Sequence, residues 1–225
     1  ERISRKQKNE LAKNNILWLG EHSGAHLHVD LIAGLPGEDI ASFADGFDRL
    51  VALKPHEIQF GILKRLRGAP IARHSEDFTL RFNPAPPYNI LSTDRISFNE
   101  MQEPSRFSRY WDIPANSGRY SRSMLLILGD SPFRHFNALS RWLYGKTRQT
   151  HAIAHERMVH LVHEYLIEGR KLDESVASEA LIADYRGTGG RSRLRFEAAD
   201  AELPLPKPER AKRHTPERQT RHLQT

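Results

Sequence analysis

His28 and Asp30 are the residues whose types and spacing are best suited to chemistry. They lie two apart in the stretch His26–Asp39, HLHVDLIAGLPGED, where two kinds of side chain alternate. Because successive side chains of a strand point to opposite faces, this imidazole and this carboxylate share one face. We interpret them either as part of a substrate pocket or as a structural histidine hydrogen-bonded to a carboxylate.

The strand that carries these two residues belongs to a larger α/β pattern. Leu35-Pro36-Gly37 ends the strand, Ile40–Lys54 has apolar residues at near-helical spacing, and Glu57–Leu63 alternates again. A strand, a helix and a strand within about forty residues predict a βαβ unit with parallel strands and a right-handed crossover.

One row of each predicted strand is apolar, whereas the other row includes His28, Asp30 and Gln59. Strands that are buried on both faces are usually apolar throughout. A barrel whose interior holds a ligand gives the mixed pattern, and so does an antiparallel sheet with one solvated face. The intervening helix favours the barrel, so we expect a polar cavity.

Basic residues follow the second predicted strand. Lys64, Arg65 and Arg67 lie in the loop at its C-terminal end, which is where α/β folds place ligand contacts. These cations either meet a carboxylate or phosphate group, with Lys64 and Arg65 lining the substrate pocket, or belong to an ordinary solvated loop.

The densest histidine cluster lies later in the chain, at His151, His155, His160 and His163. A zinc-protease helix requires His-Glu-x-x-His. Here His155 and His160 are five residues apart, which puts them about 140° apart around a helix axis. The sequence therefore predicts a solvated helix face and no metal site.

After a short strand at Thr79–Phe82, the rest of the chain is expected to be mostly helical. Ser92 or Thr93 is the expected N-terminal cap of the helix Ile96–Tyr110. The expected helices, including one before the first strand, are Ile3–Gly20, Ile96–Tyr110, Ser121–Leu128, Pro132–Tyr144, His151–Glu168 and Leu172–Tyr185. We expect an α/β part over residues 1–72, a helical domain over 73–188 and a disordered basic tail over 189–225.

Composition limits the possible functions. The 225 residues include no cysteine, which excludes disulfides, thiolate metal sites and cysteine nucleophiles. No apolar run approaches the roughly 18 residues of a membrane span, so a soluble cytoplasmic protein is expected. The net charge is +6, and ten basic but only five acidic residues lie from Arg186 onward. The tail either binds polyanions weakly and without specificity or serves solubility.

Several stretches together resemble radical S-adenosylmethionine (SAM) proteins, namely HLHVDLIAGLPGED, LKPHEIQFGILKRLRGAP, PPYNILSTDRISFNEM and PFRHFNALSRWLY. The first two resemble the later barrel strands of that family. The others resemble a C-terminal domain of unknown function in its cobalamin-binding subgroup. The resemblance implies a partial (β/α)6 TIM-like barrel, a [4Fe-4S] cluster, SAM and, in this subgroup, an N-terminal cobalamin domain.

The resemblance also implies which residues meet SAM. In the family, the strand with an Ile-x-Gly pattern lies against the SAM adenine, and the next strand borders the adenine as well. The residues that this implies for the cofactor are Ile32, Gly34, Leu35, Pro36, Gln59, Gly61 and Leu63.

The sequence departs from the family at Asp30 and Gly37, where the family pattern often has a glycine and an acid, and most decisively in its cysteines. Radical SAM chemistry needs three cysteines, usually Cys-x3-Cys-x2-Cys, and this sequence has none. We therefore interpret the chain as the C-terminal portion of a radical SAM enzyme, inactive alone, whose partner is the N-terminal barrel half of the parent protein. The cluster, and cobalamin if the enzyme uses it, are expected to be bound by parts of the parent that this chain lacks. Cobalamin-assisted methyl transfer is one reaction that the resemblance implies. The alternative is a noncatalytic scaffold or binding module with a polyanion-binding tail.

Overall fold

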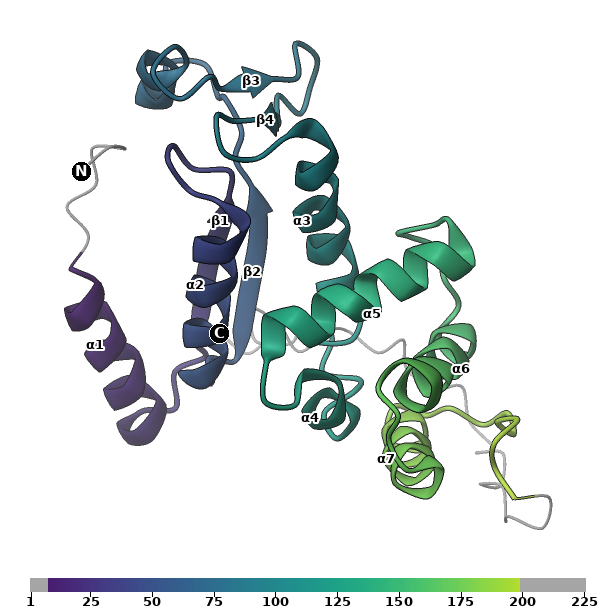
Figure 1. Ribbon diagram of the computed structural model, residues 1–225. Helices are drawn as coiled ribbons and strands as arrows, with labels where there is room; N and C mark the ends of the chain where they lie inside the picture. The colour runs from purple at the N-terminus through teal and green to yellow at the C-terminus, as the bar shows by residue number, and fades with distance from the viewer. Residues whose placement is uncertain (1–7, 199–225) are drawn as a thin grey trace.

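A computed structural model describes residues 8–198, in which an α/β part precedes a group of helices (Figure 1). The strands are β1 (His28–Ala33), β2 (Glu57–Ile62), β3 (Arg81–Phe82) and β4 (Ile90–Ser92). The α-helices are α1 (Asn9–His22), α2 (Ile40–Ala52), α3 (Phe98–Trp111), α4 (Ser123–Leu128), α5 (Pro132–Thr147), α6 (His155–Glu164) and α7 (Glu174–Gly187). A 3-10 helix, η1, spans Pro70–His74, and a π-helical turn, η2, spans Tyr165–Gly169. No helix in this described part is long and apolar enough to cross a membrane.

Strands β1 and β2 form a two-stranded parallel sheet connected by α2. Val29 is paired with Ile58 in the register. Helix α2 begins at a reciprocal cap, in which the Asp39 carboxylate accepts the Ser42 N–H at 2.8 Å and the Ser42 hydroxyl accepts the Asp39 N–H at 3.0 Å. Such a cap satisfies amide groups that have no partner within the helix. The parallel βαβ arrangement predicted from the sequence is confirmed.

An aromatic cluster joins this sheet to the helices that follow. Phe107 of α3 is fully buried. Its ring centroid lies 4.9 Å from that of Phe60 on β2 and 5.0 Å from that of Phe47 on α2. Helix α5 contributes Phe136, whose centroid is 4.8 Å from that of Phe107. Residues on both sides of Ala72 therefore belong to one hydrophobic core.

A short antiparallel hairpin, β3 and β4, extends the end of β2. The Ile90 N–H donates to the Leu63 carbonyl at 2.8 Å, and the Arg65 N–H donates to the Tyr88 carbonyl at 3.0 Å. Leu63 and Ile90 are buried in a second, smaller core with Met101. The sequence predicted a strand only near β3, because β4 has three residues and so short a segment shows no period.

Helix α3 begins at a different cap from the predicted ones. The Ser97 hydroxyl accepts the Glu100 N–H at 3.3 Å, and the Glu100 carboxylate accepts the Ser97 N–H at 2.9 Å. Thr93 instead closes the preceding turn by accepting the Ile96 N–H. The predicted caps, Ser92 and Thr93, are wrong, and the Ser-x-x-Glu pattern of a capping box identifies the right one.

The packed region extends further than the sequence predicted. Residues 191–198, which we call the C-terminal strap, lie against α6 and α7, and Leu194 in the strap is 1% exposed. The expected disorder of residues 189–225 therefore does not hold for 189–198, because a buried leucine and polar contacts fix this segment. The remainder, residues 199–225, lies outside the described part of the chain.

Candidate functional site

The candidate site is the face of the parallel sheet that the helices leave uncovered. Leu31 and Phe60 pack toward the aromatic cluster, whereas His28, Asp30 and Ile32 are exposed. The register places these three beside Glu57, Gln59 and Gly61. The predicted alternation is confirmed, but two strands cannot enclose a space, so in residues 8–198 this is an open face rather than the expected polar cavity.

A chain of hydrogen bonds runs along the N-terminal end of this open face. His28 Nδ1 lies 3.0 Å from a Glu57 carboxylate oxygen, and the other oxygen accepts the Gln59 amide at 3.2 Å. On its opposite side, His28 Nε2 lies 2.7 Å from His26 Nδ1. Glu57 therefore orients the His28 ring.

Glu57 is the partner of His28 that sequence reasoning missed. Asp30 is two residues along the same strand, about 6.6 Å away, whereas side chains of register partners start about 5 Å apart. The His28–Asp30 pairing suggested by their spacing is therefore replaced by a pair across the two strands. The structural reading of His28, a histidine bonded to a carboxylate, holds with Glu57 as the carboxylate.

Ile32 and Gly61 form the apolar centre of the open face. Ile32 is 37% exposed, and its register partner Gly61 has no side chain to cover it. Asp30 and Gln59 occupy the neighbouring register pair and present a carboxylate acceptor and an amide that both donates and accepts. The open face therefore has a small apolar centre with a polar border.

The loop after β1 is held by a half-buried carboxylate. One oxygen of Glu38 accepts the N–H groups of Gly34 at 3.0 Å and of Leu35 at 3.4 Å. Burial raises the pKa of Glu38, and these two hydrogen bonds oppose the rise. Gly34 itself is buried with a φ of +90°, and a Cβ there would lie 2.7 Å from Ile90 Cγ2. Gly34 is therefore covered by β4, unlike Ile32, and does not lie on the open face.

Replacing Gly34 with alanine is expected to lower the free energy of unfolding by about 2–3 kcal/mol, from a disfavoured φ and a steric clash. Chemical denaturation measures this change. Gly68→Ala is the matched control, because Gly68 also has a positive φ of +78° but nothing within 4 Å of its added Cβ. Equal losses in the two variants would show that the contact with Ile90 is unimportant.

The other predicted site residues divide between the surface and the second core. Lys64 and Arg65 are exposed just beyond β2, and the Arg65 guanidinium lies 5.6 Å from the centroid of the Phe82 ring. Leu63 is buried and Leu35 is half-buried against the same small core, and Pro36 is buried. Leu63 was predicted to share a face with Gly61, but β2 ends at Ile62 and the hairpin covers Leu63.

The histidine cluster of α6 does not form a metal centre in the described residues, where no group of three potential ligands is suitably placed. His155 packs against Tyr120 and Tyr185, and burial is the main reason why its pKa is lowered. His160 and His163 instead contact the C-terminal strap. The predicted solvated face is therefore partly covered.

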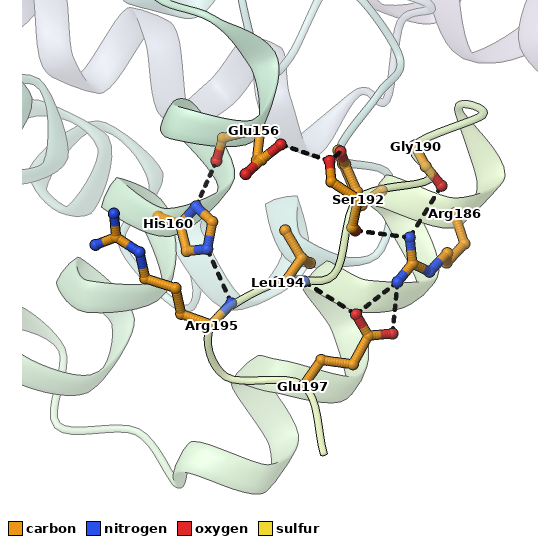
Figure 2. A network of polar contacts seen from close by, with 9 residues as sticks. Glu156, His160, Arg186, Gly190, Ser192, Leu194, Arg195 and Glu197 are labelled. Carbon is orange, nitrogen blue, oxygen red and sulfur yellow. Dashed lines mark hydrogen bonds and ion pairs between the residues drawn. The ribbon is translucent and has the colours of Figure 1, made fainter. Parts of the chain in front are cut away.

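Figure 2 shows the polar network that holds this strap. The Glu197 carboxylate accepts two hydrogen bonds from the Arg186 guanidinium, at 2.7 and 2.5 Å, and one from the Leu194 N–H at 3.1 Å. Arg186 also donates to the carbonyls of Gly190 and Ser192. Burial alone would raise the pKa of Glu197, but these donors outweigh it and the pKa is lowered. The sequence LRFE at 194–197 could have indicated this packed segment, because it holds two large apolar residues and an acid. The arginines around it made the whole region read as a basic, disordered tail.

These features define an α/β protein with one parallel βαβ unit, an open sheet face and helices that share its core. The sequence model of a family described as "Protein of unknown function (DUF4080)" matches residues 76–204. The match covers more than half of the chain, so the chain belongs to this family. The matched region includes the hairpin, α3 to α7 and the strap. No curated protein matches the sequence.

Proposed function

We propose that this chain is the C-terminal part of a radical SAM enzyme of the cobalamin-binding subgroup, and that its open sheet face forms one wall of the SAM and substrate pocket. The observation that supports this most strongly is the exposed Ile32–Gly61 surface on a parallel βαβ unit, the unit that a partial (β/α)6 barrel repeats. Domains of the matched family are known to occur in radical SAM and cobalamin-binding proteins.

The residues of the open face fit SAM. The adenine would lie on Ile32 and Gly61, with its polar edge toward Asp30 and Gln59, and the exposed Lys64 would face an anionic substrate group. SAM supplies a methyl group or a radical precursor when it is bound. Glu57 keeps His28 in a fixed orientation at the far end of the same face.

The sequence does not fit the iron-sulfur cluster, because it contains no cysteine and cluster iron is held by cysteine thiolates. In this proposal, the cluster and the cobalamin are bound by other parts of the parent protein. The chain contributes binding and orientation, and no electron-transfer step can be assigned to its residues.

Gly61→Val is expected to weaken SAM binding by the intact parent enzyme about tenfold or more, which corresponds to about 1.4 kcal/mol. The added side chain would occupy the flat surface beside Ile32. The fold should tolerate it, because a Cβ at this position meets its nearest atoms at 3.8 and 3.9 Å and valine favours strands. Equilibrium dialysis with radiolabelled SAM measures the affinity, and thermal unfolding checks the fold.

Gly24→Val is the matched control, because Gly24 precedes β1 and has no atom within 4 Å of an added Cβ. Unchanged SAM affinity in a folded Gly61→Val enzyme would exclude the open face as the SAM site. A parent coding sequence without a cysteine triad, and a parent that binds no SAM, would favour the noncatalytic scaffold instead.

A further inference from the structure

The C-terminal strap is held by two histidines of α6. His160 Nδ1 lies 2.9 Å from the Glu156 carbonyl oxygen, which can only accept. Nδ1 therefore carries the proton, and Nε2 accepts the Arg195 N–H of the strap at 3.1 Å (Figure 2). This geometry requires a neutral ring. A second proton on Nε2 would set two donors against each other and break the contact.

His163 makes the second contact with the strap. Its ring stacks on Phe196, with centroids 3.8 Å apart and an angle of 3° between the planes. His163 Nε2 lies 2.8 Å from the Ser178 hydroxyl of α7. Burial is the largest cause of the lowered pKa of His163, Glu174 opposes it, and His160 adds to it. The seated strap therefore favours the neutral form of this ring as well.

Most acidic side chains near the two rings interact with other groups, so they do little to stabilise a positive charge on either ring. Glu156 accepts the Ser192 hydroxyl, Glu164 is paired with Lys146, and Glu197 is paired with Arg186. Of the acidic groups that face these rings from α6, α7 and the strap, Glu174 is the one that favours protonated His163. The basic groups on the same elements are Arg157 on α6, Arg186 on α7, and Arg191, Arg193 and Arg195 on the strap.

We infer that the surface formed by α6 and α7 is a pH-dependent docking site for the chain's own residues 191–198. The strap is seated while His160 and His163 are neutral, and protonation of both releases it. Release uncovers the apolar seat of Leu194 and the ring face of His163. His160 and His163 thus control access to this surface.

The direction of the pH dependence follows from the preference for neutral rings. His163 released from the strap regains a pKa near 6.5, whereas burial in the seated state lowers the pKa of this ring. The contribution of His163 to strap seating is therefore fully present above about pH 6.5 and is lost as the pH falls from there toward the lowered pKa of seated His163.

Amide hydrogen exchange of residues 1–225 tests this inference. After correction for intrinsic exchange rates, the protection of the Leu194 and Arg195 amides is expected to fall about tenfold more than that of α3 amides between about pH 7.5 and 5.5. Tenfold corresponds to one pKa unit of differential protonation. An equal fall in the strap and in α3 would overturn the inference.

The variant His160→Gln/His163→Phe removes both titrating rings while keeping their contacts with the strap. The glutamine side-chain oxygen accepts the Arg195 N–H at any pH, and phenylalanine keeps the stack on Phe196, so the strap-specific pH dependence should disappear. His160→Gln alone should remove part of it, which provides a second test if the double variant folds poorly. His22→Gln on α1 is the control and should leave it unchanged. Persistence of the full dependence in the folded double variant would also overturn the inference.

Discussion

Replacing Phe107 with alanine is expected to lower the free energy of unfolding by about 3–5 kcal/mol, the usual cost of removing a fully buried aromatic ring. The loss is large because Phe107 contacts rings from β2, α2 and α5 within one cluster. Urea denaturation followed by circular dichroism and by tryptophan fluorescence measures it. We expect a single transition with coincident midpoints, because the sheet and helices share this core.

Phe98→Ala is the matched control for this experiment. Phe98 lies on the same helix, but it is 54% exposed, so its replacement should change stability by no more than about 0.5 kcal/mol. Two separate transitions in the unmodified chain, or equal effects of the two substitutions, would contradict a shared core.

Replacing Glu197 with alanine is expected to cost about 3–5 kcal/mol, the range for removing one partner of a buried ion pair. The Glu197 side chain is 6% exposed and that of Arg186 is 17% exposed, so the remaining guanidinium would lose its counterion in a poorly hydrated position. The Leu194 N–H would also lose its acceptor. Thermal and urea unfolding of residues 1–225 measure the loss.

Glu179→Ala is the control for this second prediction, because Glu179 is an exposed carboxylate on α7 and its removal should be nearly neutral. A Glu197→Ala variant as stable as the control would show that the strap contributes little to the fold. A chain that ends at Gly189 should be destabilised at least as much as Glu197→Ala, whereas removal of a disordered tail, as expected from composition, would leave stability unchanged.

The sequence by itself determined the local elements that show a regular spacing of apolar residues. The alternation through β1 and β2, the amphipathic helix between them and the turn at Leu35-Pro36-Gly37 were sufficient to predict the parallel βαβ unit. The same alternation placed His28, Asp30, Gln59 and Gly61 on one face. These features depend on residues that are close together in the chain, so they can be recognised from the sequence alone.

Only the tertiary structure decided which residues meet across the chain. His28 bonds to Glu57 rather than to Asp30, because strand register sets the closest neighbours. Gly34 and Leu63 leave the open face because a three-residue strand covers them. The strap is seated because Arg186 lies close enough to bind Glu197, although composition alone suggests disorder. Each outcome depends on the position of a distant segment, which no local pattern specifies.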